Sequence, residues 1–304
     1  MDKNILNKKF LISPFSIFDT IQKNWQDERK KWLHLGIKSE VGRDAECNVK
    51  TMSGLSPEEY LRRYGKKPMS GTSIFDPFLC EILYTWFNIE NGTILDPFAG
   101  GSVRGVIAER LGFKYTGIEL REEQVLSNRE QAKEIGVTPN WIIGDSNKKL
   151  DEIWSKFDLS FTCPPYYNLE VYSNEEGDIS NLQTYEEFLD FYGQIIKKTI
   201  DKTKDNRFII YVVSNFRDDK GAMRDFVGDT IRLHTKHPNV VLYNEIILAN
   251  AIGTLPVRVS GQFPKNRKVG KRHQNVLVFY KGDMEKIRET YPIINLESAK
   301  QGIL

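Results

Sequence analysis

The chain has 304 residues, a length that allows one large α/β domain with an appendage. Hydrophobic residues make up 40% and charged residues 28%, a balance that argues against intrinsic disorder. The 43 basic and 41 acidic residues nearly cancel, so any nucleic-acid surface must come from local clustering of charge.

The sequence contains three cysteines, Cys47, Cys80 and Cys163, without metal-ligand or redox spacing. Such a sparse, odd set fits a reducing cytoplasm better than a disulfide framework, and we expect no metal site. The N-terminus lacks the apolar core of a signal peptide, and no run of about 18 apolar residues predicts a membrane helix. We therefore expect a cytoplasmic protein with no membrane contact.

Residues 1–70 differ in pattern from the rest of the chain. Trp25, Trp32 and Leu33 fall on one side of a helix predicted within NWQDERKKWLHLGI. A second helix is predicted in SPEEYLRRYG, where a serine N-cap precedes a proline and a glycine closes the helix. We interpret residues 1–70 as a helical or irregular extension whose small basic clusters could contact nucleic acid.

From about residue 75, helices and strands alternate along the chain. The predicted helices cover residues 75–87, 102–112, 121–136, 184–200 and 221–234, and the predicted strands cover residues 93–96, 114–120, 141–145, 157–163, 207–213, 240–250 and 274–282. This alternation predicts a Rossmann-like α/β fold, with a seven-stranded, mainly parallel sheet and helices on both faces. The last two strands are joined by a loop without helical pattern, and we expect them to pair antiparallel.

Polar and glycine-rich turns follow the predicted strands, at the edge where such sheets bind ligands. The sequence D-P-F-A-G-G-S at 96–102 lies between a strand and a helix, where glycines and free N–H groups permit close approach of a ligand. Glu119 ends the next strand and is placed to accept ribose hydroxyls, and Asp145 follows a third strand. Plain tight turns and surface carboxylates are the alternative interpretation.

The nearest rival ligand for this half of the site is a pyrophosphate. The dinucleotide and P-loop glycine patterns are both absent, and an acidic residue directly before the glycines would repel phosphate. A cationic, phosphate-free nucleoside such as S-adenosylmethionine fits better.

A second motif, T-C-P-P-Y-Y, follows the fourth predicted strand at 162–167. Two adjacent prolines remove two backbone donors and fix φ, which leaves nearby carbonyls available as acceptors. An aromatic ring follows at once, so the motif suits a flat heterocycle that carries an amino group. In isolation, a Pro-Pro turn with an aromatic packing residue would be the favoured interpretation of the motif.

Together the two motifs resemble the amino-methyltransferases of DNA, the N6-adenine and N4-cytosine family. The typical cofactor motif of that family is D-P-F-x-G-S-G, and the last glycine and serine are exchanged here. The typical catalytic motif is [DNS]-P-P-[YFW], which matches residues 163–166 except at Cys163. The resemblance covers about residues 72–282, and segments such as GTSIFDP, DPFAGGSVRG and PPYYNLEVYS look like a phage- and prophage-associated branch.

The resemblance implies a role for each matching residue. The implied S-adenosylmethionine-binding residues are Thr72, Phe75, Asp96, Phe98, Ala99, Gly100, Gly101, Ser102, Glu119, Leu120, Asp145 and Ser146. The implied catalytic residues are Cys163, Pro164, Pro165 and Tyr166, with the Pro164 carbonyl on the target amino group and the Tyr166 ring on the flipped base. The domain would span residues 71–290, followed by a C-terminal tail at 291–304.

Local basic clustering appears at 264–273, in PKNRKVGKRH. We expect a loop there that contacts DNA phosphates, although a charge run is as often simply solvated. The nucleic-acid-binding residues that we expect are Tyr167, Lys265, Arg267, Lys268, Lys271 and Arg272.

The sequence therefore predicts a site-specific DNA methyltransferase that acts on a base flipped out of double-stranded DNA. Cys163 stands where the family usually has Asp, Asn or Ser, and a thiol is a weak acceptor. Its similarity to serine slightly favours N4 of cytosine over N6 of adenine. The alternatives are an RNA guanine-N2 methyltransferase, a cytosine-C5 enzyme that uses the thiol, and an inactive S-adenosylmethionine- or DNA-binding module.

Overall fold

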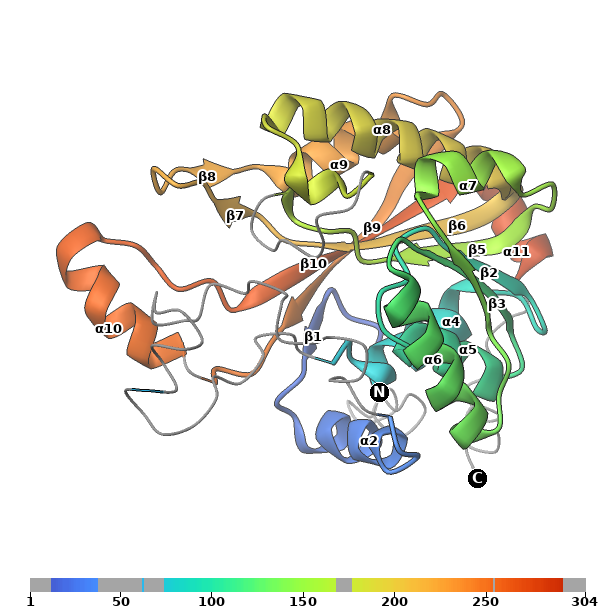
Figure 1. The fold of residues 1–304 in the computed structure, drawn as a ribbon, viewed down its shortest axis with the longest axis horizontal. Coiled ribbons are helices and arrows are strands. Elements are labelled where there is room, and N and C mark those ends of the chain that lie inside the picture. Colours follow the sequence, from blue (N-terminus) through green and yellow to red (C-terminus); the bar gives the residue numbers. More distant parts are fainter. Residues whose placement is uncertain (1–11, 38–61, 63–73, 168–176, 254, 292–304) are drawn as a thin grey trace, which may run out of the picture.

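In a computed structural model of the chain, residues 12–37, 62, 74–167, 177–253 and 255–291 are described. They form one large sheet with helices on both faces, and a short hairpin beside it (Figure 1). The strands are β1 (Ile17–Asp19), β2 (Thr93–Asp96), β3 (Lys114–Glu119), β4 (Asn140–Ile143), β5 (Phe157–Thr162), β6 (Thr203–Val213), β7 (Phe216–Arg217), β8 (Met223–Arg224), β9 (Val240–Ala249) and β10 (His273–Lys281). The helices are α2 (Lys23–Leu33), α4 (Pro77–Phe87), α5 (Val103–Arg110), α6 (Glu122–Ile135), α7 (Ser146–Glu152), α8 (Tyr185–Lys202), α9 (Phe226–Thr235), α10 (Leu255–Asn266) and α11 (Ile287–Thr290), with 3-10 turns at Ile179–Asn181 and Met284–Lys286.

The strand order is β1-β9-β10-β6-β5-β2-β3-β4. Strand β10 runs antiparallel to both of its neighbours, β6 and β9, and the other pairings are parallel. The Rossmann-like fold and the antiparallel pairing of the last two strands are therefore confirmed. The sheet has eight strands and not the seven expected, because β1 adds to its edge with Ile17 opposite Ile247 of β9.

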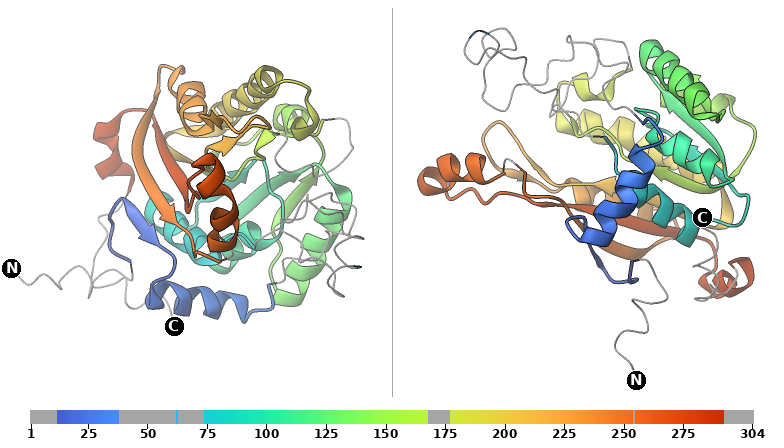
Figure 2. Two further views of the ribbon diagram at one scale, coloured as in Figure 1. Left: turned by 90° about the vertical axis from the view of Figure 1, so that its left-hand side faces the viewer. Right: turned by 90° about the horizontal axis from the view of Figure 1, so that it is seen from below.

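Two apolar layers hold the helices to the sheet (Figures 1 and 2). Helices α8 and α9 pack on one face through a stack of aromatic rings, in which Phe188 and Tyr192 are fully buried. Helices α2, α4, α5 and α6 cover the other face. No helix of the described residues is long and apolar enough to cross a membrane.

The N-terminal helix α2 is attached to the core by a buried indole. Trp25 is 0% exposed, and its Nε1 donates to Asp76 Oδ2 at 2.9 Å. The other oxygen of Asp76 caps α4 by accepting from the Phe78 and Leu79 amides. Residues 12–37 thus belong to the same core as the sheet, and the helix predicted at SPEEYLRRYG lies outside the described residues.

Three elements differ from the sequence predictions. Helix α9 begins at Phe226 because Asp225 caps it, and the residues expected in its first turn form the β7–β8 hairpin instead. Helix α7 was not predicted. Helix α10 occupies the connection expected to be a loop, where two prolines and a glycine obscure the helical pattern: Pro256 lies in its first turn, which tolerates proline, and Pro264 lies in its last.

Candidate functional site

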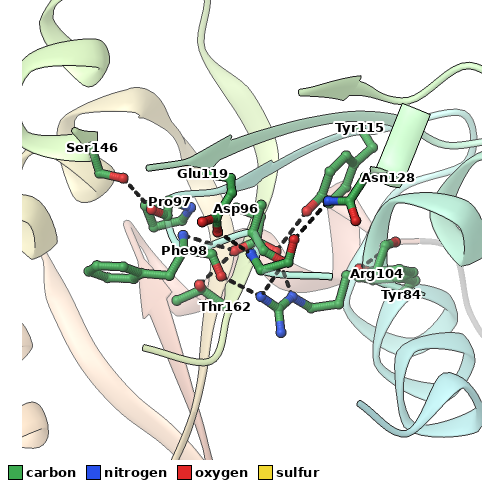
Figure 3. A network of polar contacts seen from close by, with 12 residues as sticks. Tyr84, Asp96, Pro97, Phe98, Arg104, Tyr115, Glu119, Asn128, Ser146 and Thr162 are labelled. Atoms are coloured by element: carbon green, nitrogen blue, oxygen red, sulfur yellow. Dashed lines mark hydrogen bonds and ion pairs between the residues drawn. The ribbon is translucent and has the colours of Figure 1, made fainter. Parts of the chain in front are cut away.

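The predicted cofactor residues gather at the carboxyl ends of the parallel strands β2, β3 and β4 (Figure 3). Asp96 ends β2 and begins the glycine turn, Glu119 ends β3, and Asp145 follows β4. Neighbouring parallel strands end at one edge, so residues far apart in sequence meet here. Thr72 lies outside the described residues.

Asp96 is buried beneath the turn and does not face the open crevice. Its side chain is 0% exposed. One carboxylate oxygen accepts from Thr162 Oγ1 at 2.6 Å and from the Phe98 amide at 3.1 Å. The other accepts from Arg104 Nε at 2.6 Å and from the Tyr115 hydroxyl at 2.8 Å. Because protein groups hold both oxygens, Asp96 anchors the turn, and this position replaces the direct cofactor contact expected from sequence.

Arg104 is the buried partner of Asp96 and pins the glycine turn. Its side chain is 6% exposed, and its Nη2 donates to the carbonyls of Phe98 and Ala99 (Figure 3). Its guanidinium also lies 4.8 Å from the centre of the Phe75 ring. Burial alone would lower the pKa of Arg104, but Asp96 raises it above the ordinary value, so the pair stays charged.

The glycine turn leaves room above Gly100 for a ligand. Gly100 has φ +54°, and among the described residues a Cβ built there would meet only Arg104 Nη2, at 4.0 Å. Its amide donates to Glu119 Oε2 at 2.9 Å, and its carbonyl accepts from Asn128 Nδ2 at 2.7 Å. Glu119 Oε1 accepts from the Arg121 amide at 3.1 Å. Both carboxylate oxygens of Glu119 therefore bind backbone N–H groups at the end of β3, beside the glycine turn.

The remaining cofactor predictions divide between crevice and core. Gly101, Leu120 and Asp145 are half-buried at the strand ends, and Asp145 also caps α7 through the Asn147 amide. Ser102 and Ser146 are buried, and their hydroxyls bind Gln131 and the Pro97 carbonyl, so they act on the turn and not on a ligand. Ala99 is likewise buried, whereas Phe98 is partly exposed.

The Pro-Pro-Tyr motif follows β5, next to the glycine turn. Pro164 is buried, Cys163 and Pro165 are half-buried, and no donor among the described residues binds the Pro164 carbonyl. Tyr166 turns toward β10, where its hydroxyl accepts from Gln274 Nε2 at 3.0 Å. Its ring packs edge-on against Phe226 and leaves part of its surface exposed.

Tyr167 points away from Tyr166. Its φ of +46° is unusual for a bulky residue, and the turn directs its ring against Tyr185 and Phe188 of α8. Its hydroxyl donates to the Gln183 carbonyl at 2.9 Å. Tyr167 remains half-buried in this position, and the nucleic-acid contact expected for it stays a prediction.

A cavity of about 430 Å³ opens beside Tyr166. Two arms of the chain border it: the β7–β8 hairpin and the connection between β9 and β10 that carries α10 (Figure 1). Of the basic residues predicted to bind nucleic acid, Lys271 and Arg272 line the cavity. Lys265 and Arg267 lie at the exposed end of α10. Lys268 lies against Gly221 at the tip of the hairpin, so closely that a Cβ added to this glycine would be 2.5 Å from the Lys268 Nζ.

Sequence reasoning missed Arg104, Tyr115 and Asn128. Only Arg104 carries a signal: it lies in the first turn of α5, where the helix dipole disfavours a cation, so a specific anionic partner is required. Tyr115 lies at the start of β3 and Asn128 on α6, and nothing in their local pattern points to the turn.

The chain matches a family model described as DNA methylase over residues 157–303, which covers β5, the Pro-Pro-Tyr motif and the remainder of the sheet. This match, over slightly less than half of the chain, supports the DNA amino-methyltransferase family. The predicted family is thus confirmed, and the phage-associated branch stays a prediction.

Other similar proteins include methyltransferases of RNA. A sequence relative is an uncharacterized RNA methyltransferase of Caldanaerobacter subterraneus, 39% identical over 79 residues, which are 26% of this chain and 18% of that protein. Similar solved structures are TrmN from Thermus thermophilus (13% identity, TM-score 0.46, 71% of this chain and 54% of that chain) and a precorrin-6y C5,15-methyltransferase from Geobacter metallireducens (12%, 0.45, 70% and 92%). This chain thus spans under a fifth of the curated relative and about half of TrmN.

Proposed function

We propose that this protein transfers a methyl group from S-adenosylmethionine to the exocyclic amino group of a flipped nucleic-acid base. One observation carries the proposal: the open glycine turn with Glu119 and the Pro-Pro-Tyr motif lie at the ends of the adjacent strands β2 and β5. A nucleoside cofactor at the first and a base at the second would meet at this edge.

The residues of the first half fit S-adenosylmethionine. The space above Gly100 admits a ligand against the backbone, and a carboxylate at the end of β3, Glu119, is the kind of group that accepts the two hydroxyls of a ribose. Asp96 and Arg104 neutralise each other beneath the turn, so the floor of the site carries no net charge toward the cationic sulfonium. Asp145 would hold the adenine amino group.

When bound, S-adenosylmethionine supplies an electrophilic methyl group that needs no metal and no covalent enzyme intermediate. The Pro164 carbonyl would accept one hydrogen of the target amino group, which draws the nitrogen lone pair out of conjugation with the ring. Tyr166 would hold the base plane by stacking, and Gln274 fixes the Tyr166 ring through its hydroxyl. The chain's contribution is mainly positioning of the nitrogen in line with the methyl group.

DNA is the first candidate substrate, with N4 of cytosine slightly ahead of N6 of adenine. The DNA methylase family model supports DNA, and the short match to an RNA methyltransferase makes RNA the second candidate. Transfer of labelled methyl to DNA and RNA of matched sequence separates the two. Long-read sequencing of DNA from expressing cells then reports the modified base and its context, and absence of transfer to either polymer would reject the proposal.

We expect Glu119→Gln to weaken S-adenosylmethionine binding by about 1.5–3 kcal/mol, because it removes the charge from a hydrogen bond to the cofactor. Isothermal calorimetry measures the effect. Glu123→Gln, an exposed carboxylate on α6, is the matched control and should leave the affinity unchanged. Equal affinities for both variants would contradict the assignment of Glu119 to the ribose.

We expect Tyr166→Ala to reduce methylation by an amount equivalent to about 1–3 kcal/mol, in line with the loss of one base–aromatic stack. Tyr166→Phe keeps the ring and loses only the bond to Gln274, so its loss should be smaller. Both variants should bind S-adenosylmethionine normally. A folded, cofactor-binding Tyr166→Ala protein that methylates at the wild-type rate would reject the stacking role.

A further inference from the structure

The cavity between the two arms, here called the arm cavity, has a strongly one-sided charge. Its basic lining residues are Arg217 of β7 and Lys271, Arg272 and His273 at the start of β10. No carboxylate is among the lining residues of the part of the chain described. The neutral lining includes amide side chains of Asn215, Asn250 and Gln274, which donate and accept hydrogen bonds. Its volume of about 430 Å³ lies within the range of pockets that bind small ligands.

Lys271, like Arg217, lines this cavity without an ion pair to any carboxylate of the described residues. Its ammonium is half-buried, and its one hydrogen bond in the described structure goes to the Asn215 carbonyl at 3.3 Å. Burial lowers the pKa of Lys271 without an opposing acidic group. Arg272 differs, because it forms an ion pair with Asp19 at 3.3 Å and donates to the Asn250 carbonyl at 2.8 Å. A half-buried charge without a counter-ion is costly, so the position of Lys271 is best explained by an anion that enters the cavity.

Tyr166 forms part of the wall of the arm cavity and belongs to the catalytic motif. A ligand in the cavity would therefore lie directly beside a base that stacks on the Tyr166 ring. Both arms contribute lining residues to the cavity, and the side chain of Lys268 lies close to Gly221 at the tip of the hairpin. An anion continuous with a stacked base, and long enough to run between two arms, is a nucleic-acid strand.

We propose that the arm cavity binds the sugar–phosphate backbone of the nucleotide next to the flipped base, and that Lys271 is the ligand of its phosphate. This inference rests on the proposed function and names the part of the chain that holds the strand. Arg217, on the facing arm, is the second phosphate-binding side chain. The outer part of α10, including Lys265, lies away from this contact.

Fluorescence anisotropy tests the inference with one labelled mixed-sequence oligonucleotide, presented as duplex DNA, single-stranded DNA and single-stranded RNA. In Lys271→Gln we expect about tenfold weaker binding at physiological salt, and a salt dependence whose slope falls by about 1, as loss of one phosphate contact requires. Lys271→Arg, which keeps the charge, should retain the slope. Lys133→Gln, an exposed lysine of α6, is the matched control, and it should lose less than about twofold.

Two results would overturn the inference: an unchanged slope in Lys271→Gln, or an equal loss in Lys133→Gln. If Lys271→Gln does not fold, Arg217→Gln takes its place with the same expected change in slope. S-adenosylmethionine affinity is measured on every variant, and a loss of that affinity in Lys271→Gln would also count against a phosphate role. Failure of the wild-type protein to bind any of the three oligonucleotides would reject the proposed function itself. Equal binding by the wild type and by Lys271→Gln would reject only the phosphate role of the arm cavity.

Discussion

Asp96→Ala should lower the free energy of unfolding by about 3–5 kcal/mol, because it leaves the guanidinium of Arg104 buried without its partner. The loss extends to the Thr162 and Tyr115 hydroxyls, which donate to the same carboxylate. Urea unfolding measures the change. Asp27→Ala provides the control, since Asp27 forms an exposed ion pair with Lys23 and its loss should cost less than about 1 kcal/mol.

The double variant Asp96→Ala/Arg104→Met separates a buried charge from lost packing. Removing both charges should recover part of the stability, because an isolated buried cation costs more than a missing pair. If Asp96→Ala instead unfolds like the wild type but no longer binds S-adenosylmethionine, Asp96 is a ligand residue and not the anchor of the turn.

His234→Phe should flatten the pH dependence of stability. His234 is 0% exposed, its ring stacks on Phe279 with centroids 3.9 Å apart, and burial lowers its pKa to about 3. In the unfolded chain this histidine has an ordinary pKa near 6.5. Between that pH and about 3, the unfolded chain therefore binds a proton at His234 that the folded chain does not bind. The stability that the uncharged His234 contributes is fully present above the unfolded pKa of about 6.5, and it is lost as the pH falls from there toward 3.

Between pH 7 and pH 5 the wild type should lose about 2 kcal/mol more than His234→Phe, at about 1.4 kcal/mol per pH unit below the unfolded pKa. Urea unfolding at four pH values measures the difference. Phenylalanine preserves the stack, and the lost Nδ1–H bond to the Thr230 carbonyl shifts stability equally at every pH. Parallel curves for the two proteins would mean that His234 is protonated in the folded state.

Much of the fold follows from local pattern. Turn or cap residues that can be recognised in the sequence bound the strands β2 and β5 and the helix α4. Asp76 before Pro77, at the start of α4, is one example. The gathering of Glu119 and Asp145 at one edge follows from the parallel alternation, although their roles toward a cofactor stay predictions.

The rest depends on contacts between distant residues. Asp96 could be read from sequence as an acceptor, but not as one already saturated by Arg104, Tyr115 and Thr162. Tyr166 and Tyr167 look equivalent in sequence, and only the positive φ of Tyr167 separates them. The three residues of β1 are too few to show an alternating pattern, so the eighth strand appears only through its partner.

The pairing of β1 with β9 also bears on how the chain is made. Thr20 Oγ1 donates to the Ala249 carbonyl across 229 positions, so an emerging chain cannot close this edge until most of it has left the ribosome. Without β1, the end of β9 would expose unpaired backbone groups, and the Val241 and Tyr243 side chains of β9 remain partly exposed even in the finished protein. Because β1 is synthesised first, it is already available when β9 emerges and can protect this edge from pairing with another nascent chain.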